Sequence, residues 1–342
     1  MSRAQLTSTT QQDSGGAVAP FVGAKNFVAN GGQEIWQRGT SISVAASTGA
    51  YTSDRWQTVT GANQAITVSR QATSDTTNLP NIQYCMRYQR NSGQTGTGQL
   101  TVAQSFETAS TIPFAGKTVT LSFYARAGAN YSATANGLYA ILYTGTGTDQ
   151  NALVGYTGNT TNFTSVTLTT TWQRFTYTLA VGSTVTEIAP AFGFVPSGTA
   201  GANDYYEITG VQLEVGSVAT PFSRAAGTVQ GELALCQRYY FRDSTSPGTP
   251  IGGYAYSSSL FRGQFKFPQT MRTAPSFSWV LGGGGAVLNV GGTGIAISSV
   301  ALDFASPLGL NMSVNGSGMT PGQAGVFYNN GSPTYFEISA EL

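Results

Sequence analysis

The chain has 342 residues, and only 9% of them are charged, against about 25% in typical globular proteins. Its length predicts two domains, and its 16 basic and 15 acidic residues give a net charge of +1, which excludes a general attraction to nucleic acid or to an anionic membrane. The sequence contains no histidine, which excludes Ser-His-Asp and Cys-His catalysis and every zinc or haem site that needs this residue.

The composition favours an all-β fold with little helix. Glycine, serine, threonine, asparagine and glutamine are abundant, whereas the charged residues that usually cover exposed helix faces are scarce. No run of 18 apolar residues occurs, and the start of the chain lacks a basic segment followed by an apolar one, so we expect synthesis in the cytoplasm without membrane insertion. Cys85 and Cys236 have apolar neighbours, which predicts buried free thiols with no metal and no cofactor.

Residues 1–25 are polar and almost without periodicity, so we expect a flexible arm that orders only against a partner. Residues 26–224 instead alternate apolar and polar side chains between turn signals such as Asn30-Gly31, with no helix-length pattern between the strands. This pattern predicts an antiparallel β-sandwich. Two of its strands are expected to bury Val119, Leu121 and Phe123, and Phe175, Tyr177, Leu179 and Val181.

The stretch GVQLEVGSVATPF at 210–222 predicts the closing strand of this sandwich. Apolar and polar residues alternate in it, which is typical of a strand buried on one face only. The buried face would hold Val211, Leu213 and Val215, and the solvent face would hold Gln212 and Glu214. Pro221 lacks a backbone N–H and should end the pairing, which leaves Phe222 as an apolar plug.

Residues 225–238 are expected to link this domain to a smaller C-terminal β domain at 239–342. A helical turn is conceivable at 232–237, but the sequence CQRYYF at 236–241 favours a strand. The glycine-rich stretch 281–294 lacks the Lys-Ser or Lys-Thr pair and the helix of a phosphate loop, so we expect a flexible loop between strands.

Alternation within the C-terminal domain separates an apolar face from a polar one. The sequence SLFRGQFKF at 259–267 places three phenylalanines with Gly263 on one face, and Arg262, Gln264 and Lys266 on the other. The closing sequence TYFEISAEL should bury its alternate residues in a strand that tethers the end of the chain. These residues are Phe336, Ile338, Ala340 and Leu342.

Five stretches in this order resemble a module of bacteriophage tail-fibre and other virion proteins. They are NFVANGGQEIWQRGTS at 26–41, YTSDRW at 51–56, SFYARAG at 122–128, GVQLEVGSVATPF at 210–222 and ELALCQRYYF at 232–241. The module is similar to carbohydrate-binding jelly rolls, which implies an antiparallel jelly-roll β-sandwich at 26–224. The resemblance also implies a structural virion protein for host attachment, without catalysis, docked on other virion proteins through its N-terminal arm and assembled as a homotrimer. It leaves open the place in the virion: tail fibre, tail tip, baseplate or capsid fibre.

Two other functions remain open at this point. One is a carbohydrate-binding module or adhesin outside a virion, and the other is a glycan-cleaving enzyme with two carboxylates. Several acids lie in or beside predicted strands, where outward-facing or turn-capping carboxylates are the ordinary interpretation; they are Glu107, Glu187, Asp204, Glu207 and Glu214. Asp204 and Glu207 could alternatively contribute to a Ca²⁺ site, although their spacing is a weak signal.

Host recognition, if the chain performs it, is expected in the C-terminal domain. Sugars are bound by aromatic rings and by polar side chains that reach their hydroxyls. Tyr254 and Tyr256 share the parity of Arg262, and Trp279 precedes the glycine-rich stretch, so these four residues are the candidate glycan site. The alternative is that Trp279 is a core residue and the tyrosines cover a subunit contact. Trp36 and Trp56 are expected to pack in the sandwich core.

Overall fold

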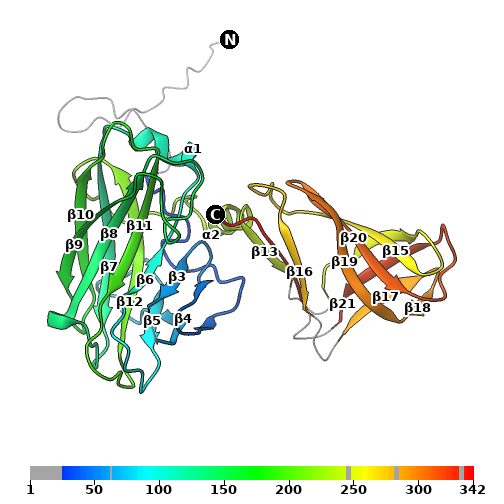
Figure 1. The fold of residues 1–342 in the computed structure, drawn as a ribbon, viewed down its shortest axis with the longest axis horizontal. Helices are drawn as coiled ribbons and strands as arrows, with labels where there is room; N and C mark the ends of the chain where they lie inside the picture. The colour runs from blue at the N-terminus through cyan, green and yellow to red at the C-terminus, as the bar shows by residue number, and fades with distance from the viewer. Residues whose placement is uncertain (1–24, 62–63, 244–247, 281–284, 331–334) are drawn as a thin grey trace, which may run out of the picture.

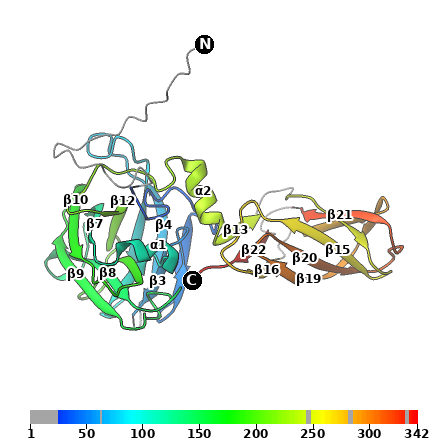
Figure 2. The same ribbon diagram turned by 90° about the horizontal axis from the view of Figure 1, so that it is seen from above.

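The computed structural model describes residues 25–61, 64–243, 248–280, 285–330 and 335–342, and it confirms the all-β prediction. Two lobes are visible, with β1 to β12 in one and β13 to β22 in the other (Figure 1). Seen from above, the helix α2 lies between the two lobes, and β13 follows it at the start of the second lobe (Figure 2). The predicted arm, residues 1–25, lies outside the described residues except for Lys25.

The first lobe is an antiparallel jelly-roll sandwich of two six-stranded sheets. The first sheet contains, in spatial order, β1 (Ser41–Val44), β4 (Ile66–Ala72), β5 (Tyr84–Arg90), β12 (Tyr205–Val215), β7 (Thr118–Ala127) and β10 (Gln173–Ala180). The second contains β2 (Gly49–Tyr51), β3 (Gln57–Thr60), β6 (Leu100–Ala103), β11 (Glu187–Phe194), β8 (Gly137–Gly145) and β9 (Thr160–Thr167). One turn of helix, α1 (Thr108–Thr111), precedes β7.

The core of this sandwich contains residues that were predicted from the alternation of apolar and polar side chains. Val119, Leu121 and Phe123 of β7 are fully buried, and Val181 just after β10 is buried as well. Phe175, Tyr177 and Leu179 are only partly buried because β10 lies at the sheet edge. Trp36 and Trp56 are core residues, as expected.

The closing strand β12 is buried on both faces as far as Glu214, so the prediction of a half-buried strand is wrong. Val215, which was expected on the buried face, is 46% exposed at the end of the strand. Gln212 and Glu214 are buried, since the segment after the strand folds back over them and Thr220 bonds to both side chains. A bulge between Thr209 and Gln212 shifts the register, and Gly210 supplies the positive φ of 57° that this bulge needs. Phe222 packs on the cluster around Trp172, as the plug prediction requires.

The predicted linker contains a helix, α2 (Val229–Gln237), where the sequence CQRYYF favoured a strand. Thr228 caps it by accepting a hydrogen bond from the Gly231 amide, and Glu232 lies in the first turn, where a carboxylate is favourable. These start signals override the strand preference of the aromatic residues, so pairing begins only at β13 (Tyr240–Asp243). Cys236 in this helix and Cys85 are buried free thiols, as predicted.

The second lobe packs a three-stranded sheet on a seven-stranded sheet. The small sheet has the order β13, β22 (Tyr335–Ser339), β16 (Ser276–Val280). The large sheet has the order β18 (Thr293–Ile295), β17 (Ala286–Val290), β21 (Ala324–Asn329), β14 (Ile251–Ala255), β15 (Leu260–Lys266), β20 (Gly309–Gly316) and β19 (Ile297–Ser306). Strand β17 occupies part of the stretch 281–294 that was expected to be a loop, and residues 281–284 lie outside the described ranges.

The end of the chain contacts the first lobe instead of continuing a strand. Strand β22 buries Phe336 and Ile338 as predicted but ends at Ser339, and Leu342 is only partly buried. The Leu342 carbonyl accepts hydrogen bonds of 2.8 Å from the Tyr51 hydroxyl and 2.7 Å from the Asn151 amide, both in the first lobe. The predicted tether is therefore a contact between lobes (Figure 1).

Candidate binding site

The outward face of the seven-stranded sheet carries most of the predicted site. In β15, Arg262, Gln264 and Lys266 point away from the core while Phe261 and Phe265 point into it, as the alternation predicted. Strand register then places Tyr254 of β14 beside Arg262 and Asn311 of β20 beside Gln264. The outer face of the sheet therefore gathers aromatic, amide and cationic side chains.

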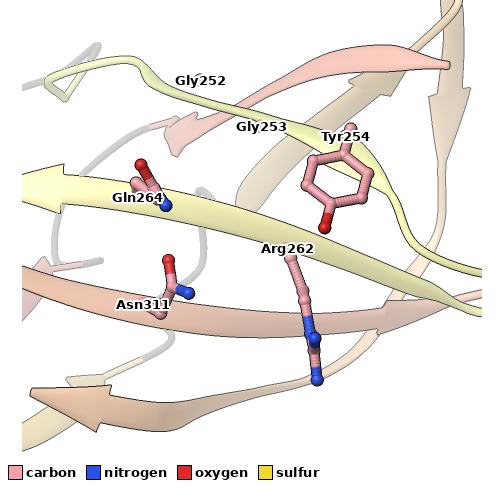
Figure 3. A pocket seen from close by; sticks show the side chains of 6 residues that line it. All are labelled: Gly252, Gly253, Tyr254, Arg262, Gln264 and Asn311. Carbon is pink, nitrogen blue, oxygen red and sulfur yellow. The ribbon is translucent and has the colours of Figure 1, made fainter. Parts of the chain in front are cut away.

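A hollow of about 380 Å³ lies over the centre of this face. Its lining residues are Gly252, Gly253, Tyr254, Arg262, Gln264 and Asn311 (Figure 3). The view shows the Tyr254 ring beside Arg262, and the amides of Gln264 and Asn311 on the two neighbouring strands. Tyr254 is 48% exposed, so its ring can contact a ligand from solvent.

A second hollow of about 280 Å³ adjoins the first one and shares Gln264 and Asn311 with it. It continues toward β19, where Phe304 and Leu308 form its apolar side and Lys266 its charged side. Both apolar side chains are 62% exposed, and together they give this hollow an apolar surface that is open to solvent. We call the two hollows together the sheet groove.

A bulge in β19 brings Phe304 to this face. Leu302 pairs with Met312 and points inward, and simple alternation would turn Phe304 inward as well. The register shifts between these two residues, so Phe304 pairs with Asn311 and points outward.

The same bulge leaves Asp303 near Arg262, at 3.2 Å between the Asp303 Oδ2 and Arg262 Nε atoms. Asp303 also accepts a hydrogen bond from the Ser313 hydroxyl. The guanidinium of Arg262 lies 4.3 Å from the ring centre of Tyr256. Arg262 is thus held between an acid and an aromatic ring, and it forms a fixed wall of the groove.

The structure brings together three of the four predicted site residues. Tyr254 and Arg262 line the groove, and the ring of Tyr256 packs against the guanidinium of Arg262. Trp279 lies elsewhere: it belongs to β16 of the small sheet and packs on Phe327, with a centroid distance of 5.0 Å. The expected platform of Trp279 with the two tyrosines does not form, because its strand belongs to the other sheet.

The acids that could suggest a glycosidase are occupied by structural partners. Asp204 pairs with Arg90 at 2.7 Å, and Glu207 pairs with Arg87 and with Arg126, both at 2.6 Å. These carboxylates are fully buried, so the outward-facing prediction is wrong for them, and the cations occupy the oxygens that a Ca²⁺ ion would need. Within the described ranges no cluster of three acids or cysteines could hold a metal ion.

Two other acids of this set show opposite pKa shifts. Burial raises the pKa of Glu187, and the hydrogen bond from the Gln150 amide compensates this only in part. Burial also acts to raise the pKa of Glu107, but hydrogen bonds from Arg238 and Tyr239 outweigh it and hold the pKa below its usual range. Glu214 accepts hydrogen bonds from Thr220 within the first lobe.

None of the helices in the described ranges has both the length and the apolar character needed to cross a membrane.

Neither a protein family nor a curated protein sequence matches this chain. Among solved structures, the chain is similar to a carbohydrate-binding module of family CBM4, at 19% identity and a TM-score of 0.28, over 39% of this chain and 71% of that one. It is also similar to the enzymatically active domain of bacteriophage CBA120 tailspike protein 4, at 15% identity and a TM-score of 0.35, over 56% of this chain and 21% of that one. The module TmCBM61, solved with β-1,4-galactotriose, matches at 12% identity and a TM-score of 0.32, over 56% of this chain and 99% of that one. At these scores the similarities establish neither a family nor a function.

Proposed function

We propose that the sheet groove binds a glycan and that the chain is a non-enzymatic attachment component of a bacteriophage virion. The observation that carries the binding proposal is the arrangement of Tyr254, Gln264 and Asn311 around one hollow. An exposed aromatic ring stacks on the apolar face of a sugar, and amides both donate to and accept from its hydroxyls. The groove offers these two kinds of contact side by side.

The binding function needs no catalysis. The chain lacks histidine, and the acids Asp204, Glu207 and Glu107 are held in ion pairs with arginines of the first lobe and the junction. Asp303, the acid beside the groove, pairs with Arg262, and glycoside cleavage requires two carboxyl groups on opposite sides of the scissile bond. These observations favour binding over hydrolysis.

The virion role is supported by the five stretches that resemble the tail-fibre module. A particle protein also benefits from buried thiols, because burial protects them from oxidation, and both cysteines of this chain are buried. In this proposal the arm at 1–25 docks on other virion proteins, the chain assembles as a homotrimer, and the mature protein resides in the particle. Mass spectrometry of purified particles tests the location, and light scattering of the purified chain tests the trimer; a chain missing from particles but binding glycans would be an adhesin instead.

A glycan array tests the binding function with matched variants. Tyr254→Ala should weaken binding about two- to thirteenfold, because aromatic contacts contribute about 0.5–1.5 kcal/mol beyond their buried area. Phe163→Ala is the control, since Phe163 is 57% exposed but belongs to β9 of the first lobe. Binding that is unchanged in the first variant, or reduced equally in both, would contradict the proposed site.

A further inference from the structure

We infer that the ligand is an extended, acidic glycan chain that crosses strands β14, β15, β20 and β19, with Gly252 as the floor of its path and an acid group at Lys266. This inference rests on the proposed glycan-binding function and adds the length and the charge of the ligand. Three independent features of the groove carry it: its extent across the sheet, a glycine that the fold does not require, and the placement of charge.

The groove is longer than a single sugar ring. Its lining residues belong to four adjacent strands in the order β14, β15, β20, β19, which corresponds to three strand spacings of about 4.8 Å, or about 14 Å. Gln264 pairs directly with Asn311, and Asn311 with Phe304, so these side chains form a row across the strands. Because both hollows share the two amides, a chain can occupy both without interruption.

The fold of the strand does not require a glycine at position 252. A Cβ atom added there would meet no atom within 4 Å, and the residue faces outward into the first hollow. Its neighbour Gly253 differs: a Cβ atom there would overlap the carbonyl oxygen of Arg262 and lie 2.7 Å from the Phe261 ring. A glycine inside a strand costs about 0.5–1 kcal/mol relative to alanine, so Gly252 is best explained by the open space it leaves for a ligand.

Between β13 and β22 the second lobe has few charged residues, and most of them lie at the groove; Arg242, Asp243 and Glu337 belong to the small sheet. Residues 248–330 contain four charged side chains, which are Arg262, Lys266, Arg272 and Asp303. Arg272 bonds to the carbonyls of Ala340 and Glu341 at the junction of the lobes, and Arg262 pairs with Asp303.

Lys266 is exposed, lines the second hollow and has no ion-pair partner among the described residues. The groove therefore carries one uncompensated positive charge beside an apolar wall of Phe304 and Leu308. This combination fits a sugar acid whose ring contacts the apolar wall while its carboxylate reaches the ammonium group.

The first experiment tests the path of the chain with two glycine variants. Gly252→Leu fills the first hollow and should weaken glycan binding by about tenfold or more, with a folded protein by circular dichroism. Gly294→Leu is the control, because Gly294 is also an exposed strand glycine with ordinary φ but lies in β18, outside the groove. A folded Gly252→Leu protein with wild-type affinity would overturn the inferred path.

The second experiment tests the charge of the ligand. The wild-type protein is applied to an array of acidic and neutral polysaccharides and of single sugars, and the strongest ligand is then tested again after chemical reduction of its carboxyl groups. We expect acidic chains to bind best, and we expect carboxyl reduction, Lys266→Gln and raised salt each to weaken binding about 1.5- to 5-fold, without additivity between Lys266→Gln and reduction.

The outcomes separate this inference from the function on which it rests. Strong binding of neutral chains, or of single sugars as tightly as of chains, would overturn the inference and leave the glycan-binding function standing. An array without any bound glycan, with a folded wild-type protein, would contradict the proposed function itself.

Discussion

Replacement of Glu341 by glutamine should loosen the junction between the two lobes. Glu341 belongs to the end of the chain, yet its carboxylate pairs with Arg38 and Arg55 of the first lobe. The side chains of Arg55 and Glu341 are 3% and 5% exposed, so water cannot replace a lost partner. The variant Glu341→Gln keeps the shape of the side chain and removes only its charge, which leaves two guanidinium groups without their counter-ion.

The expected loss of stability is about 3 kcal/mol. Removal of one partner from a buried ion pair costs about 3–5 kcal/mol. The low end applies because Arg55 keeps a hydrogen bond of 2.6 Å to the Ser105 carbonyl and its stacking on the Tyr239 ring at 3.4 Å, and because glutamine keeps one oxygen acceptor. A loss of this size corresponds to a decrease in Tm of about 6–12 °C, at about 2–4 °C per kcal/mol for a domain of this size.

Differential scanning calorimetry measures this effect, and Asp75→Asn is its control. Asp75 lies half-buried in a loop of the first lobe, and asparagine keeps an oxygen that can accept the hydrogen bonds from the Thr77 and Asn78 backbone amides. The same loss of charge there should therefore lower the Tm far less than Glu341→Gln does. If both variants melt at the wild-type temperature, the pair at Glu341 does not stabilise the junction. If the control falls as far as Glu341→Gln, the effect is one of net charge and not of burial.

Three further variants or reagents test other parts of the structure. Burial raises the pKa of Glu187 above its unfolded value of about 4.3. Between the two pKa values the native state binds more protons than the unfolded state does, so the protein loses stability there as pH rises. Glu187→Gln should therefore increase the free energy of unfolding at pH 7 by more than it does at pH 4, and an equal change at both pH values in urea titrations would contradict this. Gly253→Ala should destabilise the second lobe by more than about 1 kcal/mol and Gly252→Ala should not, in the same assay; equal losses would show that neither Cβ environment is as described. Burial also raises the pKa values of the Cys85 and Cys236 thiols, so maleimide should label them only after unfolding, and rapid labelling at neutral pH would contradict their burial.

The strands could be predicted from the sequence more easily than the segments that pack against their faces. Alternation identified the inward residues of β7 and β15. One face of each strand packs on a core, and the resulting apolar pattern can be read from neighbouring residues in the sequence. It failed at β12, where Gln212 and Glu214 look like solvent-facing residues but are covered by the segment that follows the strand. A covering segment leaves no trace in the alternation of the strand that it covers.

The candidate site shows the same limit at longer range. The parity of Tyr254 and Arg262 placed them on one face correctly, since β14 and β15 are neighbours in both sequence and sheet. Asn311 could not be assigned to this face without the pairing of β20 with β15. Phe304 would have been assigned to the core, because the bulge that turns it outward contains no proline or glycine from which it could be predicted. Trp279 was misplaced because a sequence does not show which of two sheets a strand joins.

The placement of charge connects the stability of this chain with its proposed ligand. With so few charged residues, the first lobe and the junction use most of their arginines in buried or half-buried pairs, such as Arg90 with Asp204 and Arg55 with Glu341. Such pairs resist salt screening because water and ions do not reach them. In the second lobe, by contrast, Lys266 stands exposed beside the groove. Raised salt should therefore weaken binding of an acidic chain at the groove while it leaves the melting temperature of the protein nearly unchanged, and a parallel fall of both would show that the internal pairs are more open to solvent than their burial implies.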